Sequence, residues 1–351
     1  MKVKLPVRKA ILARKTYEAP AEGRRGKIRL DFNENTTGCS AAALEAIRRL
    51  NAKDLATYPE YDKLTRDIAR YFRLKPADLL LTNGGDDALR VFFDTFVEPG
   101  THILICEPTF PMYRYYAEIA GARVETLHYN AQMEFPLNAA LAALRKRPRV
   151  FFLANPNNPT GTLVPLDEIE KLVRAARNSV VVLDEAYAEF CGVNAIALTR
   201  RYRHLFVART FSKAAGLAGL RLGAVIANAE SLALVRRAMP PYPVNTAALV
   251  AAAAAIKERK AIADYVSGTQ QRRKWLADQL QKEGVRVFPS AANFLLADFG
   301  ARGPAFFRKL ARHNILVRER SKDLGPGFAR ITIGTQSELN QFLRLLRQED
   351  F

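Results

Sequence analysis

One lysine, Lys213, stands in a stretch of small residues, Phe211-Ser212-Lys213-Ala214-Ala215-Gly216, that leaves room for a flat ring beside its nitrogen. The stretch follows an apolar run, residues 205–208, that predicts a strand. A lysine attacks a carbonyl carbon only as the free amine, so its pKa must be lowered by burial or by nearby positive charge. Arg209 and Arg221 are the expected source of that charge. Because most lysines are exposed, Lys213 indicates a nucleophile only together with matching groups elsewhere.

Two further turns carry such groups. Asp184 directly follows a buried run, residues 180–183, where a carboxylate is costly unless it is paired. A protonated pyridine nitrogen is one such partner. Tyr187 offers a phenol for a ring oxygen, and Asn158 offers an amide from the turn after residues 150–154. Each residue taken singly also has an ordinary structural explanation, such as a cap, a turn or a packed ring.

A glycine-rich turn supplies a candidate phosphate site. Asn83-Gly84-Gly85-Asp86-Asp87 joins a predicted strand, residues 79–82, to a predicted helix, residues 88–96. Glycine lets a ligand approach the backbone, and free N–H groups at a helix start bind anions. With Arg221 added, the four turns match the functional groups of pyridoxal 5′-phosphate (PLP).

The elements that must position these groups follow an alternating pattern. Apolar runs alternate with helical patterns, which implies right-handed crossovers and a mostly parallel sheet covered on both faces. The polar turns follow the carboxyl ends of the strands, where open α/β sheets bind ligands. The predicted strands are residues 79–82, 102–106, 124–127, 150–154, 180–183, 205–208 and 223–227.

The chain has 351 residues, more than one hydrophobic core usually serves. We expect an N-terminal arm at residues 1–30 and a large α/β domain at residues 31–245. Residues 246–351 mix helical patterns with three apolar runs and predict a smaller α+β domain.

Composition narrows the class of protein. Three separated cysteines and four scattered histidines match no metal-ligand spacing, so no metal is expected. No apolar run is long enough to span a bilayer, and the N-terminus lacks a signal-peptide core, so we expect a cytoplasmic protein. The net charge of +19 admits nucleic acid, an anionic membrane or anionic small molecules as partners. Because the basic residues are scattered and no nucleic-acid-reading module accompanies them, we interpret most of the charge as solvated surface and expect neither nucleic acid nor membrane as a partner.

Seven segments together resemble the fold-type-I PLP-dependent aminotransferases, most closely the histidinol-phosphate aminotransferase family. They span residues 31–335 in the family's order. The segments are Asp31-Phe32-Asn33-Glu34-Asn35, Thr57-Tyr58-Pro59, Glu107-Pro108-Thr109-Phe110, residues 155–161, Asp184-Glu185-Ala186-Tyr187, residues 211–221 and Arg330-Ile331-Thr332-Ile333-Gly334-Thr335.

The resemblance implies PLP as cofactor and a role for each matching residue. Lys213 binds the cofactor and later moves a proton, and Asp184 keeps the ring nitrogen protonated. Tyr187 and Asn158 hold the ring oxygen, and Phe110 stacks on the ring. The implied ligands of the cofactor phosphate are Gly85, Asp86, Asp87, Thr210, Ser212 and Arg221.

The resemblance also implies partners. Tyr58 would reach the cofactor phosphate of a neighbouring subunit, which implies a homodimer with shared sites. Arg330 would pair with the substrate carboxylate near Asn158, a contact that suits its planar fork. Arg318 and Tyr17 are candidates for a distal phosphate. The substrates would be an amino donor and a 2-oxo acid.

The expected reaction is transamination between L-histidinol phosphate and 2-oxoglutarate. Three departures from the family pattern stand beside it: Thr36-Thr37 where Pro-Tyr is usual, Phe110 where Tyr is frequent, and Asp87 where Glu is common. None removes a group that transamination needs, but the first alters a loop near the substrate. The alternatives are a decarboxylase of phosphorylated threonine, an aromatic amino acid aminotransferase, and a basic nucleic-acid-binding protein on this scaffold.

Overall fold

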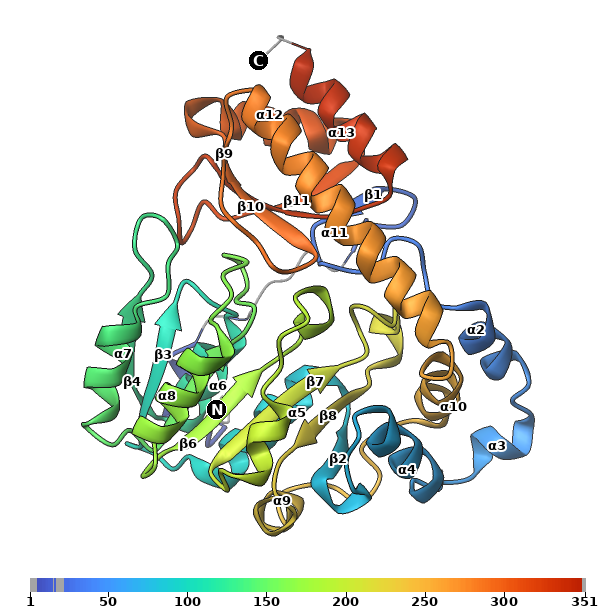
Figure 1. The fold of residues 1–351 in the computed structure, drawn as a ribbon, viewed down its shortest axis with the longest axis vertical. Helices are drawn as coiled ribbons and strands as arrows, with labels where there is room; N and C mark the ends of the chain where they lie inside the picture. The colour runs from blue at the N-terminus through green and yellow to red at the C-terminus, as the bar shows by residue number, and fades with distance from the viewer. Residues whose placement is uncertain (1–4, 15, 17–21, 349–351) are drawn as a thin grey trace.

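The computed structural model describes residues 5–14, 16 and 22–348, and their strands form two sheets. In Figure 1 the five-stranded sheet and helices α11–α13 lie above the seven-stranded sheet and its helices. Residues 28–30 and residues 259–348 meet in the upper unit. The predicted Tyr17 lies outside the described residues.

The larger sheet has the strand order β2-β8-β7-β6-β5-β3-β4. Its four pairs from β7 to β4 are parallel, whereas β8 runs antiparallel to both β2 and β7. This confirms the predicted α/β class with a mostly parallel sheet. The strands are β2 (Leu79–Thr82), β3 (His102–Glu107), β4 (Arg123–His128), β5 (Val150–Ala154), β6 (Val180–Asp184), β7 (Leu205–Thr210) and β8 (Gly223–Ile226).

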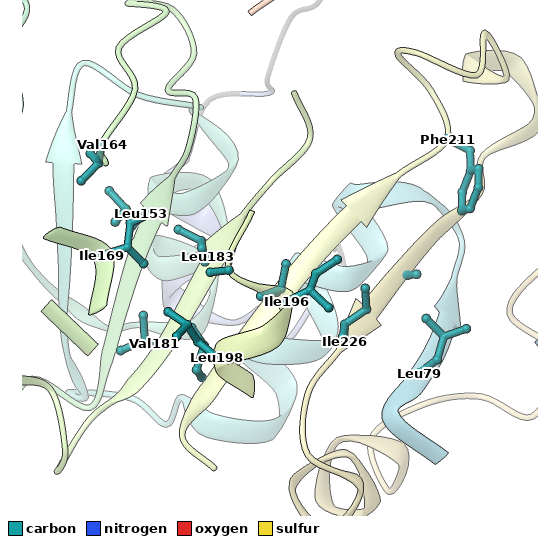
Figure 2. Packing of buried hydrophobic residues seen from close by; sticks show 14 of the residues in the cluster. Leu79, Leu153, Val164, Ile169, Val181, Leu183, Ile196, Leu198, Phe211 and Ile226 are labelled. Atoms are coloured by element: carbon teal, nitrogen blue, oxygen red, sulfur yellow. The ribbon is translucent and has the colours of Figure 1, made fainter. Parts of the chain in front are cut away.

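Both faces of this sheet are covered, which explains why strand β5 is apolar and buried at every position. Along β5, Phe151 and Leu153 enter one core while Val150 and Phe152 enter the other. Figure 2 shows part of the first core, with side chains of β5, β6 and β8 pointing to one face. The helices α4, α7, α8 and α10 contribute to the first core, and α5, α6 and α9 to the second.

The helices of the larger unit follow the predicted pattern, with α3 and α9 as additions. They are α2 (Ala41–Arg48), α3 (Ala52–Ala56), α4 (Asp62–Tyr71), α5 (Gly84–Phe96), α6 (Met112–Ala120), α7 (Leu137–Leu144), α8 (Leu166–Ala175), α9 (Ala229–Arg236) and α10 (Thr246–Ala255). Short helices are α1 (Lys9–Leu12), η1 (Pro76–Asp78), η2 (Ala188–Phe190), η3 (Ile196–Arg200) and η4 (Ala218–Leu220).

The smaller sheet has the strand order β1-β11-β12-β10-β9. Its strands are β1 (Ile28–Leu30), β9 (Arg286–Val287), β10 (Phe294–Asp298), β11 (Ile315–Glu319) and β12 (Phe328–Thr332). The remaining helices are α11 (Arg259–Lys282), η5 (Gly300–Arg302), α12 (Gly303–Arg312) and α13 (Gln336–Arg347). Apolar residues of α11, α12 and α13 pack on this sheet in a third core.

Two elements sit differently from the sequence-based division. β1 belongs to the expected arm by sequence, but it pairs in parallel with β11 of the smaller sheet. α10 falls after residue 245, but its alanines pack in the core of the larger sheet and against α2. The exact domain limits stay a prediction, and we propose that the C-terminal boundary lies at the start of α11. Within the described ranges no helix has the length and hydropathy needed to cross a membrane.

Candidate active site

A cavity of about 460 Å³ opens where the carboxyl ends of β5, β6 and β7 face the smaller sheet. It gathers most of the predicted site residues, which lie up to 245 positions apart (Gly85 to Arg330) in the chain. The predicted residues that line it are Gly85, Asp86, Phe110, Asn158, Asp184, Tyr187, Thr210, Ser212, Lys213, Arg221, Arg318 and Arg330.

Lys213 projects into this cavity from the loop after β7. Its Nζ donates a hydrogen bond to the Phe32 carbonyl at 3.0 Å. Burial, followed by the positive charge of Arg330, lowers the pKa of Lys213 to about 8, and Arg221 acts in the same direction. The requirement for a lowered pKa is met, but the expected role of Arg209 is wrong. Arg209 is buried in ion pairs with Glu185 and Glu189, which neutralise it.

Asp184 ends β6 and presents its carboxylate to the cavity. Its Oδ2 accepts a hydrogen bond from the Tyr113 hydroxyl at 2.7 Å, and its Oδ1 accepts one from the Ala186 N–H at 3.0 Å. Burial raises the pKa of Asp184, whereas the bond from Tyr113 acts against that rise. Tyr113 was not identified as a site residue from the sequence. Its position three residues after Phe110, at the start of α6, could have indicated that it lies near the ring-binding site.

Tyr187 lies near Lys213, whose Nζ is 5.8 Å from the centre of its ring. The Tyr187 hydroxyl accepts a hydrogen bond from Asn33 Nδ2 at 2.9 Å. Burial raises the pKa of Tyr187, and Arg330 and Asn33 oppose the rise. Asn33 belongs to a segment that resembles the aminotransferase motifs, residues 31–35, but no role was assigned to it from the sequence.

Asn158 and Arg330 meet across the cavity from the two sheets. The Asn158 Oδ1 accepts a hydrogen bond from Arg330 Nη1, and Nη2 of the same arginine donates to the Asp31 carbonyl. Arg330 is buried, which lowers its pKa to about 10. Arg318 and Arg320 line the same wall. Arg320 is paired with Asp323, so Arg330 and Arg318 are the two arginines of this wall that suit a carboxylate or phosphate.

The opposite end of the cavity is built for a small anion. Gly84 has φ +83°, and a Cβ there would lie 2.6 Å from the Arg221 guanidinium. Arg221 Nη2 already binds a carboxylate, that of Asp86, at 2.9 Å. The hydroxyls of Thr210 and Ser212 join this end. Free N–H groups at the start of α5, a nearby guanidinium and two hydroxyls form a phosphate-binding set.

Two predicted residues lie away from the cavity lining. Asp87 accepts a hydrogen bond from the Asn83 N–H and pairs with Arg90, so its carboxylate stabilises the start of α5. Tyr58 is 77% exposed and stacks on Tyr242, with ring centres 4.4 Å apart.

The donor set fits a phosphorylated pyridine aldehyde such as PLP. An amine of lowered pKa stands where an aldehyde carbon can be attacked, and a buried carboxylate stands where a ring nitrogen can be held. Tyr187 and Asn158 supply polar groups for a ring oxygen. Among the residues that the structure describes, no group of histidine, cysteine and carboxylate side chains could hold a metal ion.

Comparisons with known proteins agree with this chemistry. A family model described as aminotransferase class I and II matches residues 25–346. The histidinol-phosphate aminotransferase of Geobacillus sp. (strain WCH70) is 35% identical over 92% of this chain and 89% of that protein. The solved histidinol-phosphate aminotransferase from Clostridium acetobutylicum is 26% identical, covers 91% of this chain and 98% of its own, and has a TM-score of 0.84.

The Sinorhizobium meliloti histidinol-phosphate aminotransferase, solved in complex with pyridoxal-5′-phosphate, matches 99% of both chains. Its TM-score is 0.89 at 24% identity, which is a likeness of fold.

Proposed function

Because the chain belongs to the class I and II aminotransferase family, we propose that it transfers the amino group of L-histidinol phosphate to 2-oxoglutarate with PLP as cofactor. Membership confirms the resemblance drawn from the motifs. The observation that carries the proposal is one cavity that joins the low-pKa amine of Lys213 to Asp184 and Arg330. The substrate is proposed because relatives that match about nine-tenths of the chain are histidinol-phosphate aminotransferases.

When bound, PLP supplies an aldehyde carbon that accepts amines and a protonated ring that withdraws electrons. The Asp184 carboxylate would hold the proton on the ring nitrogen. The Tyr113 hydroxyl, which donates to Oδ2, favours the ionised form of that carboxylate against the effect of burial. Tyr187 and Asn158 would face the ring oxygen, and Phe110 would lie against the ring. Arg221, Gly85, Asp86, Thr210 and Ser212 would hold the phosphate.

Lys213 would serve as nucleophile and then as base. With a pKa of about 8, roughly a quarter of its amines are uncharged at pH 7.5, enough for attack on a carbonyl. Once the substrate amine has taken its place, the freed Lys213 can accept the substrate Cα proton and return it to another carbon. The hydrogen bond to the Phe32 carbonyl would orient the amine during this step.

The arginine wall would bind both substrates. The fork of Arg330 suits the carboxylate of 2-oxoglutarate. Histidinol phosphate has no carboxylate, so its phosphate would bind at the same wall, where Arg318 adds positive charge. Tyr17, predicted for the distal phosphate, stays a prediction.

We also propose a homodimer that works in the cytoplasm. Tyr58 and Tyr242 form an exposed aromatic pair outside the cavity of their own subunit. An exposed stacked pair suits burial against a second copy, where Tyr58 would reach the partner's phosphate site. Sedimentation at several concentrations tests the dimer, and a monomer at all of them would exclude a shared site.

One absorbance experiment tests the proposed reaction. L-Histidinol phosphate is added to the PLP-loaded protein without keto acid, and the visible band is expected to convert to that of pyridoxamine phosphate. Adding 2-oxoglutarate should restore the first band. A band that responds only to phosphothreonine, with release of CO₂, would indicate the decarboxylase. A band that responds only to aromatic amino acids would indicate an aromatic amino acid aminotransferase. The absence of any PLP band would refute the assignment of this protein as a PLP enzyme.

A further inference from the structure

Asn33 is enclosed between the two sheets and uses all of its polar atoms. It is 1% exposed, and its φ of +54° lies in the left-handed region, which asparagine tolerates better than most residues. Its N–H donates to Thr332 Oγ1 at 2.9 Å, and its carbonyl accepts from Asn293 Nδ2 at 3.0 Å. These bonds fix where its side chain can point.

The same contacts set the orientation of the Asn33 amide. Thr332 Oγ1 accepts from the Asn33 N–H and donates its own proton to Asn33 Oδ1, at 3.2 Å. The amide Nδ2 therefore faces Tyr187 and donates to its hydroxyl at 2.9 Å. A phenol has one proton and also accepts hydrogen bonds. Since its oxygen accepts from Asn33, its proton is left for a partner on the cavity side.

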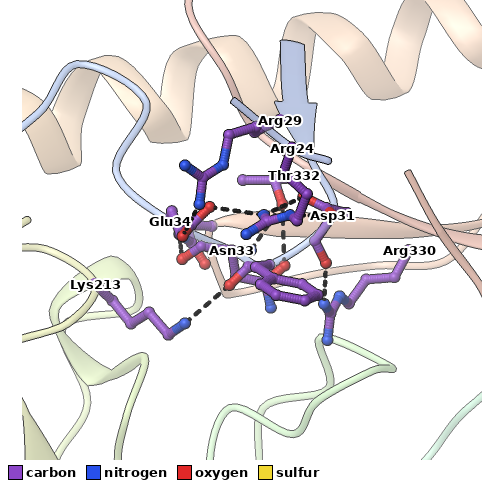
Figure 3. Close-up of polar contacts among 10 residues, drawn as sticks. Arg24, Arg29, Asp31, Asn33, Glu34, Lys213, Arg330 and Thr332 are labelled. Atoms are coloured by element: carbon purple, nitrogen blue, oxygen red, sulfur yellow. Dashed lines mark hydrogen bonds and ion pairs between the residues drawn. The ribbon is translucent and has the colours of Figure 1, made fainter. Parts of the chain in front are cut away.

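These bonds connect the two units of the protein. Thr332 ends β12 two residues after Arg330, and Asn293 directly precedes β10, so both belong to the smaller sheet. Tyr187 follows β6 of the larger sheet. The neighbouring Phe32 carbonyl accepts from Lys213 across the same gap. Figure 3 shows Asn33, Thr332, Lys213 and Arg330 gathered around the segment that follows β1.

We propose that Asn33 is a positioning residue that directs the phenolic proton of Tyr187 toward the ring oxygen of the cofactor. Through Thr332 it links this hydrogen bond to β12, the strand that carries Arg330. The inference rests on the proposed function, since it needs Tyr187 to face the cofactor. Anion binding at Arg330 and the hydrogen bond from Tyr187 to the ring oxygen then both depend on how the smaller sheet packs against the larger one.

The test uses the pH midpoint of the visible absorbance of the PLP-loaded enzyme. A hydrogen bond donated to the ring oxygen favours the form with more negative charge on that oxygen, so its loss raises the midpoint. Asn33→Asp keeps the shape and the acceptor for Thr332 but replaces the amide donor by an oxygen, toward which the phenol turns its proton. We expect a rise of roughly 0.5 to 1 pH unit, the worth of one hydrogen bond.

A double-mutant cycle with Tyr187→Phe separates this effect from the new negative charge. The charge acts in both backgrounds, whereas the redirected proton exists only when Tyr187 is present. We therefore expect a clearly smaller shift from Asn33→Asp in the Tyr187→Phe background. Equal shifts in both backgrounds, or none in the wild-type background, would overturn the role of Asn33. No shift from Tyr187→Phe itself would instead overturn the proposed role of Tyr187.

Two further variants complete the design. Thr332→Val keeps the side-chain shape but removes the hydroxyl that orients the amide, and a smaller rise of the midpoint is expected. Thr332→Val also tests the role of the Asn33 amide if Asn33→Asp does not fold. Asn228→Asp, at the half-buried N-cap of α9, retains its cap and should leave the midpoint unchanged. A lower melting temperature in Thr332→Val with an unmoved midpoint would mean that the contact is structural only.

Discussion

The contact between Tyr113 and Asp184 gives a prediction whose size depends on pH. Tyr113→Phe removes one oxygen and leaves the ring stacked on Phe152, with ring centres 5.4 Å apart. Asp184 Oδ2 then loses its donor, while Oδ1 keeps the Ala186 N–H. A hydrogen bond to a charged group contributes about 1.5–3 kcal/mol and one between neutral groups about 0.5–1.5 kcal/mol. The loss is therefore greater when Asp184 is ionised.

The direction in which stability changes with pH follows from the folded-state pKa of Asp184. Burial raises this pKa above that of the unfolded chain, so ionisation of Asp184 lowers stability as pH rises from the unfolded toward the folded pKa. Removing Tyr113 raises the pKa further. We expect Tyr113→Phe to reduce the free energy of unfolding by about 1.5–3 kcal/mol above the folded pKa of Asp184 in the variant, and by about 1 kcal/mol less below its folded pKa in the wild type, because the unfolded state is the same in both proteins.

Urea unfolding of wild type and Tyr113→Phe, without added PLP, from pH 4 to pH 8 measures this difference. Tyr129→Phe is a matched control, because Tyr129 is buried in the core on the other face of the sheet and has no carboxylate partner among the described residues. A loss of stability in Tyr113→Phe that is the same at every pH would refute the reasoning. In the PLP-loaded enzyme, the acid limb of the kcat/KM profile should move up by roughly one pH unit.

Three other predictions follow from the cavity. Lys213→Ala should abolish the visible band of lysine-bound cofactor and transamination together; a variant that retains either would exclude the lysine assignment. Arg330→Lys should raise KM for 2-oxoglutarate roughly 10- to 100-fold and leave PLP affinity unchanged, since lysine lacks the two-pronged contact; unchanged kinetics would place the carboxylate site elsewhere. Gly84→Ala should cost about 1–2 kcal/mol of stability and weaken PLP binding, because of its positive φ and the close Arg221. Gly100→Ala is the control, because Gly100 also has a positive φ (+82°) but has open space at its Cβ position and lies outside the cavity lining. It should leave PLP binding unchanged, and an equal loss of PLP affinity in both variants would contradict this account.

The sequence by itself determined the elements and most of the site. Apolar runs and helical spacing predicted all seven strands of the larger sheet, because these signals are local to each segment. The turns with Asp184, Asn158 and Lys213 were expected at one edge, since parallel strands bring their carboxyl ends together. The structure gathers these three residues in one cavity. Their roles in the reaction are proposals, and the variants above test those of Lys213 and Asp184.

Only the tertiary structure decided which groups touch. Arg209 precedes Lys213 by four residues, yet two carboxylates neutralise it. Burial and, after it, the distant Arg330 lower the lysine's pKa instead. Tyr113 reaches Asp184 over 71 positions and Asn33 reaches Tyr187 over 154. β1 lies within the expected arm but pairs with β11. Hydrogen bonds and pKa shifts depend on distance and burial in the folded chain. Sequence spacing determines neither the distance nor the burial of groups on segments that meet only when the two sheets pack together.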